Sequence, residues 1–327
     1  MKQGFWKKLK KPILALAPME DVTDAAFRRI IAKYGKPDVI FTEFTSCDGL
    51  VSEKGREHVL HDLLYTQEER PIVAQIFGST PENFYTAAQI IVKLGFDGID
   101  INMGCPVNKI VNANSCSALI KTPDLALEII EATQKGAGNL PVSVKTRLGW
   151  NENEVESWIP HLLKAEPAAL ILHGRTRKQM SKVPADWNAI ARAVEIRNSL
   201  KSKTLIIGNG DVKTPTQARL YASQYGVDGV MIGRGIFGNP WLFNESIDPM
   251  SITPQQKLEV MLEHTKLFGE IFQNRRNFAI MKKHYKAYVN GWKGAKSLRI
   301  RLMQTQNFHE VEEIVQSALR ASVEPHL

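Results

Sequence analysis

The first 235 residues of this 327-residue chain contain eight short runs rich in Ile, Val and Leu, separated by stretches with apolar residues at helical spacing. Successive runs begin 25 to 44 residues apart, close to the roughly 30 residues of a strand with its crossover helix. Runs that are apolar throughout are typical of parallel strands buried on both faces. Eight such units favour a closed (β/α)8 TIM barrel over an open doubly wound sheet. The predicted strands are residues 13–19, 39–44, 71–78, 98–104, 142–149, 169–175, 204–211 and 229–235.

The predicted helices have recognisable ends. Four of them begin with a Thr-Pro pair, at residues 80–81, 122–123, 214–215 and 253–254. This pair places a capping hydroxyl before a proline at the first helical position, and Gly95 ends the first of the four helices. Beyond Asp248 the strand pattern stops. We therefore expect an α/β protein with a barrel domain of residues 1–245 and a small all-helical domain of residues 246–327.

Polar residues stand at the ends of the predicted strands, where a barrel of this kind binds its ligands. They are Pro18, Met19, Glu20, Glu43, Gln75, Asn102, Cys105, Lys145, Arg147, His173, Arg175, Asn209, Gly210, Asp211, Gly233, Arg234 and Gly235. The last two strands end in glycine turns, which let backbone N–H groups approach a phosphate. Lys145 lies in an otherwise apolar strand, where a buried charge needs an anion beside it. Together with Gln75 and His173, it suits the polar edge of a flavin ring.

Positive charge is concentrated in one segment of the chain. Lys and Arg number 42 against 34 Asp and Glu, a net charge of +8, and residues 275–301 contain no acid. The basic residues of this segment are Arg275, Arg276, Lys282, Lys283, Lys286, Lys293, Lys296, Arg299 and Arg301. Basic residues interleaved with aromatic ones indicate either a polyanion partner or a solvated helix face.

Several classes of protein are excluded or disfavoured. Three cysteines without a Cys-x-x-Cys pair indicate a reducing compartment and argue against a zinc or iron–sulfur site, so we expect no metal. No stretch is apolar over the ~18 residues that a membrane span needs, and the N-terminal apolar run is too short for a secretory signal. We expect a cytoplasmic protein with no membrane partner. The sequence also contains no P-loop glycine motif.

Taken together, these segments resemble the tRNA-dihydrouridine synthase family. The matching segments are APMEDVTDAAFR (17–28), FTEFTSCDGLV (41–51), QIFGS (75–79), DGIDINMGCPVNKIV (97–111), SALI (117–120), VSVKTRLGW (142–150), LHGRTRKQM (172–180), ADW (185–187), IIGNGDV (206–212) and DGVMIGRGIFGNPW (228–241). They cover the predicted barrel from end to end in the family's order. Residues 282–304 also resemble the family's helical RNA-binding domain.

The resemblance implies an FMN-dependent enzyme that reduces specific uridines of the tRNA D-loop to 5,6-dihydrouridine, with NADPH as the reductant. Hydride would pass from flavin N5 to uracil C6. Cys105, in the family's Gly-Cys-Pro motif, would protonate C5 as the catalytic residue. A thiol with an ordinary pKa near ~8.5 suits this task.

The resemblance also implies which residues hold the cofactor and the RNA. Those expected at FMN are Pro18, Met19, Glu20, Gln75, Lys145, His173, Asn209, Gly210, Asp211, Gly233 and Arg234. Those expected at the tRNA are Asn102, Lys109, Arg177, Lys282, Lys283, Arg299 and Arg301. Asn102 and Arg177 would grip a uracil flipped out of the RNA stack, and the basic helical segment would bind backbone phosphates. We expect a monomer.

Two loops depart from the family's pattern. Asn114 and Cys116 stand where glycines are expected after the Cys105 motif, and Val183 replaces a glycine in the loop of residues 177–187. Asn tolerates a left-handed backbone and Cys much less, so we expect a stiffer loop. Two alternatives stay open: another FMN barrel acting on a free pyrimidine, as dihydroorotate dehydrogenase does, and a catalytically impaired tRNA-binding barrel. The choice of uridine and of NADPH over NADH is not encoded in a separate motif.

Overall fold

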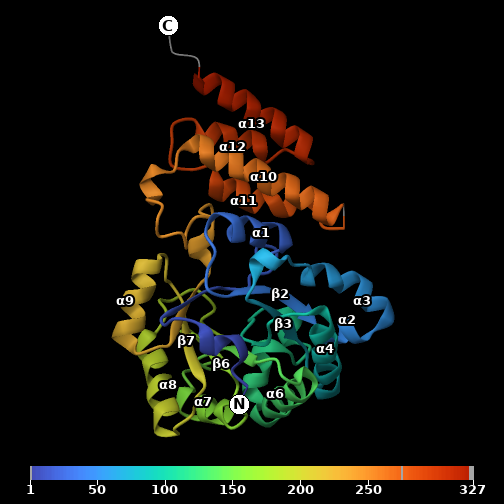
Figure 1. The fold of residues 1–327 in the computed structure, drawn as a ribbon, viewed down its shortest axis with the longest axis vertical. Coiled ribbons are helices and arrows are strands. Elements are labelled where there is room, and N and C mark those ends of the chain that lie inside the picture. The colour runs from blue at the N-terminus through green and yellow to red at the C-terminus, as the bar shows by residue number, and fades with distance from the viewer. Residues whose placement is uncertain (1, 274, 324–327) are drawn as a thin grey trace.

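The computed structural model describes residues 2–273 and 275–323, and its larger part is a barrel of eight parallel strands (Figure 1). All eight predicted strands are present, so that prediction is confirmed. They are β1 (Ile13–Leu16), β2 (Ile40–Ser46), β3 (Ile72–Phe77), β4 (Gly98–Met103), β5 (Val142–Arg147), β6 (Ala169–His173), β7 (Leu205–Asn209) and β8 (Gly229–Ile232).

The sheet closes on itself. Neighbouring strands follow the order β1-β8-β7-β6-β5-β4-β3-β2, and every pair is parallel. Leu16 N donates to Val39 O at 3.1 Å, and a bridge between Ala15 and Val39 joins β1 to the segment that leads into β2. Because all the strands run the same way, their carboxyl ends meet on one face, which is where barrel enzymes place their chemistry.

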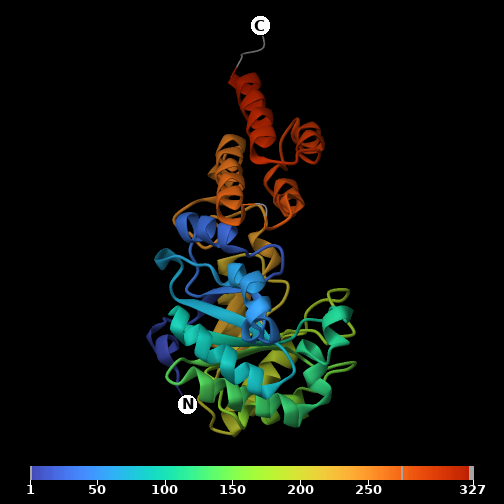
Figure 2. The same cartoon turned by 90° about the vertical axis from the view of Figure 1, so that its right-hand side faces the viewer.

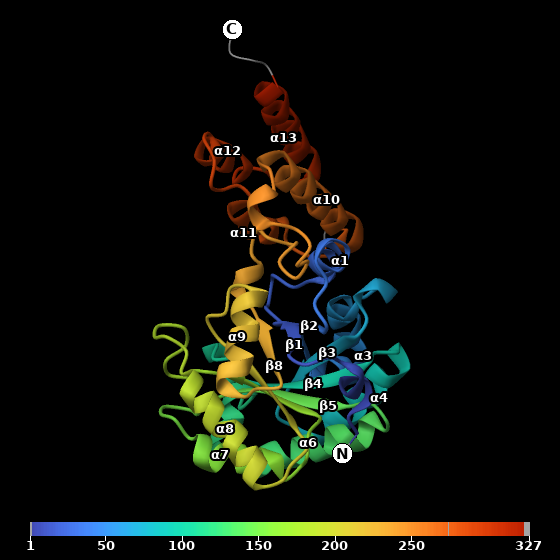
Figure 3. The same ribbon diagram turned by 60° about the vertical axis from the view of Figure 1, so that its left-hand side comes forward.

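Alternation along each strand divides the barrel's apolar side chains into two sets. Ile13 and Ala15 of β1 belong to the cluster inside the barrel, whereas Leu14 and Leu16 belong to the larger cluster between strands and helices. The helices around the strands are α1 (Ala25–Tyr34), α2 (Cys47–Val51), α3 (Glu53–Val59), α4 (Pro81–Leu94), α5 (Asn108–Val111), α6 (Pro123–Ala137), α7 (Val155–Leu163), α8 (Trp187–Ser199) and α9 (Pro215–Tyr225) (Figure 3).

The predicted helix caps are confirmed in two of four helices. The hydroxyls of Thr214 and Thr253 accept from backbone N–H groups of the first turn, but those of Thr80 and Thr122 make no such bond. Proline occupies the first turn in all four helices. Gly95 ends α4 in a left-handed conformation, φ 81°, as expected.

The segment after the barrel is helical and stands above it (Figures 1 and 2). Its helices are α10 (Pro254–Phe272), α11 (Met281–Tyr288), α12 (Ala295–Leu302) and α13 (Phe308–Val323). Helix α1 connects the two parts, because Phe27 packs in the barrel cluster while Ala26 and Ile30 pack in a second cluster with residues of α10 to α13. The domain boundary after residue 245 stays a prediction. No helix among the described residues is long and apolar enough to span a bilayer.

Candidate active site

A pocket of about 1070 Å³ opens at the carboxyl ends of the strands. Cofactor and small-molecule sites usually enclose about 300–1,000 Å³, so this pocket has room for a large ligand. It brings together every barrel residue expected at the cofactor, and Asn102 and Cys105 as well. The expected cofactor residues in the lining are Pro18, Met19, Glu20, Gln75, Lys145, His173, Asn209, Gly210, Asp211, Gly233 and Arg234. Lys109 and Arg177 lie outside the lining.

The lining has more positive than negative side chains. Its Lys and Arg residues are Lys145, Arg147, Arg175, Lys213 and Arg234, and its acids are Glu20 and Asp211. This balance favours an anionic ligand. In the described part of the chain, no three His, Cys, Asp or Glu side chains are arranged to hold a metal ion.

Lys145 reaches the pocket from β5 with little to neutralise it. The hydrogen bond from its Nζ to Asn209 Oδ1 is long, at 3.3 Å. Burial, and then the positive charge of Arg147, lower the pKa of Lys145 to about 8, while Asp100 opposes the shift. A half-buried ammonium so weakly paired fits an anionic group bound in the pocket.

His173, at the end of β6, is a neutral imidazole. Burial, followed by the positive charges of Lys145 and three arginines, lowers its pKa to about 2. Arg175 Nη1 lies 3.0 Å from His173 Nε2. A guanidinium only donates, so Nε2 accepts and the ring proton is on Nδ1. His173 therefore offers the pocket one N–H donor without a charge.

The turn after β7 has an unusual backbone conformation at the pocket lining. Gly210 has φ 134°, and a Cβ there would lie 2.6 Å from the Cβ of Ala185, so the position requires glycine. Asp211 follows with φ 58°. Its carboxylate accepts from Arg175 Nη2 at 2.5 Å and Arg234 Nη2 at 3.1 Å. Since a carboxylate repels a phosphate, we interpret Asp211 as the group that orients these two arginines.

Asn102 holds the turn that carries Cys105. Its Oδ1 accepts from the backbone N–H groups of Gly104 and Cys105, both at 3.0 Å. Its Nδ2 donates to Gln75 Oε1 at 3.0 Å, and Gln75 Nε2 donates to Asp100 Oδ2 at 2.7 Å. The family resemblance implies only a contact with the substrate for Asn102. In the structure its amide also fixes the position of the thiol.

Cys105 is a half-buried thiol with a perturbed acidity. A hydrogen bond from the Cys116 thiol, a backbone N–H at Val107 and the charge of Arg147 lower the pKa of Cys105 to about 6, against the effect of burial. Cys116 is fully buried, and burial raises its pKa well above the ordinary value. At neutral pH the pair therefore shares one negative charge, centred on Cys105.

The glycine replacements lie where a left-handed backbone occurs. Asn114 has φ 56° and Cys116 has φ 55°. Both values fall in the region that glycine adopts without strain. Val183 is not among the residues with positive φ, and its carbonyl accepts from Arg175 Nε at 2.6 Å. Asn114 and Cys116 thus hold the Cys105 loop in a conformation that is unfavourable for residues other than glycine, while the stiffness expected of this loop stays a prediction.

Arg147 and Arg175 line the pocket, although sequence reasoning assigns them no role beyond their place at strand ends. Both are buried, 6% and 3% exposed. Arg147 donates to the carbonyls of Gly104, Thr176 and Met180, so it ties the Cys105 turn to the loop after β6. The sequence does contain a signal that could have identified these two arginines. Each is a charged residue near the end of a largely apolar strand, and the same kind of signal singled out Lys145.

Arg177 lies at the pocket's rim instead of inside it. Its Nη2 donates to Asn108 Oδ1 at 2.7 Å, which connects the loop after β6 with α5. Its guanidinium lies 4.6 Å from the ring centroid of Trp150, as does the ammonium of Lys121. Lys109, on α5, is exposed nearby in the chain. Arg177 is not among the residues that line the pocket, and its contact with the target base stays a prediction.

In the helical part, the basic segment is less available than its sequence indicates. Lys283 Nζ pairs with Asp21 Oδ2 at 3.2 Å, and Arg299 Nη1 donates to Val289 O at 2.7 Å. Arg276 is 8% exposed and pairs with carboxylates of the barrel. Lys282 is half-buried and Arg301 is exposed. The side chain of Arg276 is therefore not available to RNA. The RNA contacts expected of Lys282, Lys283, Arg299 and Arg301 stay predictions.

Comparison with known sequences identifies close relatives. The family described as dihydrouridine synthase (Dus) matches residues 15–324. A probable tRNA-dihydrouridine synthase of Staphylococcus aureus (strain COL) is 42% identical over 96% of this chain and 95% of its own length. Probable tRNA-dihydrouridine synthase 2 of Bacillus subtilis (strain 168) is 41% identical over 96% of each chain.

Solved structures with a similar fold are more distant. A 2-naphthoyl-CoA reductase in complex with 2-naphthoyl-CoA aligns over 75% of this chain with a TM-score of 0.57 and 13% identity. A histamine dehydrogenase from Rhizobium sp. 4-9 aligns over 78% with a TM-score of 0.52 and 14% identity. The alignments span 52% and 48% of those two chains. At these identities they support the barrel fold alone.

Proposed function

The chain belongs to the dihydrouridine synthase family, and from that premise we propose that it reduces uridines of tRNA to 5,6-dihydrouridine. In finer terms, we propose FMN as the cofactor, NADPH as the reductant and the D-loop as the place of the target uridines. Reduction of the C5–C6 double bond takes a hydride at C6 and a proton at C5. Reduced flavin supplies the hydride when it is bound, and the protein's residues hold the reactants and the proton.

The observation that carries this proposal is the weakly paired, half-buried ammonium of Lys145 in a pocket with excess positive charge. A flavin gains negative charge on reduction, so a cation beside its ring stabilises the reduced form. The neutral His173 and the amide of Gln75 would add hydrogen bonds along the same polar edge. The backbone of Pro18, Met19 and Glu20 would contact the ring. The residues proposed for the phosphate are Asn209, Gly210, Gly233 and Arg234, with Asp211 orienting the arginine.

Cys105 would deliver the proton. Uracil C5 takes a proton from Cys105 Sγ–H, and the S–H electron pair stays on sulfur as thiolate. Because the pKa of Cys105 lies at about 6 in the free protein, only its protonated fraction acts as an acid. The neutral Cys116 thiol donates toward that sulfur and stabilises the thiolate left after the transfer.

The tRNA would cross the mouth between two loops that contain no acid, residues 104–121 and 174–185. Their exposed or half-buried cations are Lys109, Lys121, Arg177, Lys178 and Lys182. A uridine that leaves the RNA stack would enter beside Cys105, while its neighbours' phosphates meet these cations. We propose that residues 246–327, with Lys282 and Arg301, continue this surface as the tRNA-binding domain. We propose that the protein acts as a cytoplasmic monomer.

The test uses the full-length protein and tRNA from a strain that lacks its gene. We expect the purified protein to bind FMN and show its yellow absorbance, NADPH to bleach it, and dihydrouridine to appear at D-loop positions. Absence of flavin binding would refute the cofactor assignment. A bleached protein that leaves every uridine unchanged would refute the substrate.

A further inference from the structure

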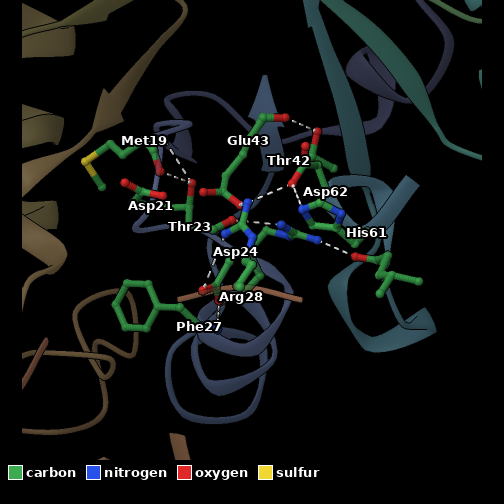
Figure 4. A network of polar contacts seen from close by, with 12 residues as sticks. Met19, Asp21, Thr23, Asp24, Phe27, Arg28, Thr42, Glu43, His61 and Asp62 are labelled. Carbon is green, nitrogen blue, oxygen red and sulfur yellow. Dashed lines mark hydrogen bonds and ion pairs between the residues drawn. The ribbon is translucent and has the colours of Figure 1, made fainter. Parts of the chain in front are cut away.

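Arg276 comes from the helical part, yet its side chain lies in a group of barrel carboxylates. Its Nη2 lies 2.8 Å from Glu43 Oε2 and 2.7 Å from Asp62 Oδ1, and its Nη1 lies 3.8 Å from Asp24 Oδ2. Figure 4 shows these three acids converging from different segments of the barrel. The neighbouring Arg275 is exposed. Two adjacent arginines of one basic segment thus have opposite environments.

Among the described residues, the ion pairs of Asp24 and Glu43 are with this guanidinium, whereas Asp62 also lies 3.0 Å from His61 Nε2. Asp24 and Glu43 are almost completely buried, at 0% and 1% exposed. Burial raises the pKa of both, repulsion by Asp24 adds to the rise at Glu43, and Arg276 opposes it at each. The other buried arginine of the network, Arg28, is 2.8 Å from a different acid, Glu69. Loss of Arg276 would leave buried acids without their cation, which is strongly unfavourable.

Asp24 ends the turn that lines the cofactor pocket. One oxygen caps α1 and the other faces Arg276. In the preceding turn, Met19 N donates to Thr23 Oγ1 at 2.9 Å, and Thr23 N donates to Met19 O at 2.9 Å (Figure 4). Met19 and Glu20 of this turn line the pocket. Through its contact with Asp24, Arg276 therefore fixes the end of the turn whose residues Met19 and Glu20 line the pocket.

Two further contacts reach residues beside the pocket lining, one in β2 and one in the turn that contains Met19 and Glu20. Glu43 precedes Phe44, which lines the pocket from β2. Asp21 has φ 53°, an uncommon conformation for a residue other than glycine, and Lys283 of α11 pairs with its carboxylate. Two cations of the helical part thus contact the turn, one at its strained residue and one at its end.

We propose that Arg276 is a positioning residue for the cofactor pocket, which fixes the turn of residues 18–24 and the end of β2 from the helical part. The identity of the ligand as flavin rests on the proposed function. The positioning itself concerns only this chain's residues. It makes the cofactor pocket depend on the docking of the helical part, and it removes Arg276 from the RNA-binding surface.

The test compares Arg276→Gln with Arg275→Gln, which removes the same charge one residue away. We expect Arg276→Gln to weaken FMN binding to the apoprotein at least tenfold, and to speed amide hydrogen exchange in residues 19–23, at a temperature where circular dichroism shows a folded protein. Arg275→Gln leaves both unchanged, and Arg276→Lys lies between. The double variant Glu43→Gln/Arg276→Gln also removes one of the buried acids that would otherwise lack a cation. We expect it to recover part of the FMN affinity.

Other results would overturn the inference. If Arg276→Gln lowers the melting temperature while FMN affinity and exchange in residues 19–23 match wild type, Arg276 is only structural. Arg276→Gln alone could be too unstable to measure. In that case, wild-type FMN affinity and wild-type amide exchange in residues 19–23, in both the double variant and Arg276→Lys, would also show that Arg276 is only structural. If the wild type binds no FMN, the proposed cofactor fails. Hydrogen exchange in residues 19–23 then still decides whether Arg276 orders the turn.

Discussion

The mouth of the barrel and the basic segment of the helical part are both rich in Lys and Arg, but they use them differently. At the mouth, Arg177 and Lys121 hold their charges at the surface, each 4.6 Å from the ring centroid of Trp150. In the helical part, Arg276 and Lys283 turn toward acids of the barrel. We therefore propose that the basic residues of the mouth bind RNA and that Arg276 serves internal structure. The RNA contact predicted for Lys283 stays a prediction, since its ion pair with Asp21 is exposed.

The difference shows that a run of like charges does not by itself identify a binding surface. Whether such a run is free to bind a partner depends on whether carboxylates of another element pair with it. Asp24, Glu43 and Asp62 lie more than two hundred residues from Arg276 in the sequence. The loops at the mouth contain no acid and face the pocket, so their charge stays available for a polyanion.

The largest effect should come from the thiol at the mouth. Cys105→Ala removes the proton donor, so we expect dihydrouridine formation to slow by about 10²- to 10⁴-fold while FMN and tRNA affinities stay the same. Cys47→Ala, at a buried thiol of the core, is the matched control and keeps most of the activity. The measurement is the rate of dihydrouridine formation under single-turnover conditions. Full activity of Cys105→Ala would remove this residue from the mechanism.

The next effect concerns the cation inside the mouth. Lys145→Met should weaken FMN binding by roughly ten- to a hundredfold, because about 1.4–3 kcal/mol of hydrogen bonding from the charged ammonium to the polar edge of the ring is lost. The pKa of Lys145 is about 8, so the wild-type affinity should fall as the pH rises through that value and the ammonium loses its proton. Fluorescence titration from pH 6 to pH 9 measures both. Lys164→Met, at an exposed lysine after α7, is the control, and equal affinity in both variants would contradict the assignment.

A smaller effect separates the two basic regions directly. Removing Arg177 and Lys121 together should weaken tRNA binding about tenfold and reduce the slope of log affinity against log salt by roughly 1.5. Removing Lys283 and Arg299 should change the affinity less than threefold, because Asp21 and Val289 already bind these two side chains. Filter binding across salt concentrations gives both quantities. The reverse order would show that the helical segment contributes more to RNA binding than the mouth does.

The smallest effect tests the pair of thiols. Cys116→Ala removes the hydrogen bond that contributes most to lowering the pKa of Cys105 from its ordinary value to about 6. We expect the pH midpoint of iodoacetamide alkylation at Cys105 to move upward, with a several-fold slower reaction near pH 6. Mass spectrometry of the alkylated peptide follows the rate. An unchanged midpoint would show that Cys116 does not tune the thiol.

Most of the barrel could be predicted from the sequence because strand burial follows a simple pattern. Once the eight strands are assigned, the carboxyl end of each one fixes which residues share a face. Lys145, His173 and Asn209 therefore meet in one pocket although they come from three strands. The Thr-Pro caps were harder to predict. The sequence places the hydroxyl of Thr80 or Thr122 before the helix, but it does not determine the side-chain rotamer on which the capping hydrogen bond depends.

The rest of the site depends on contacts between distant segments. Nothing local distinguishes Arg276 from Arg275, and only the packing of α10 on α1 brings the former to Glu43. Asn102 was chosen as a polar strand end, but its hold on the Cys105 turn depends on how that turn folds back. Arg177 lies outside the pocket lining because its guanidinium packs on the Trp150 ring and donates to Asn108.

The most direct test mixes the reduced, FMN-loaded protein with tRNA from a strain that lacks its gene, with no other reductant present. The account predicts that flavin absorbance returns and that one dihydrouridine forms for each flavin oxidised. Flavin that stays reduced in the presence of this tRNA, or that reoxidises anaerobically without forming dihydrouridine, would contradict it.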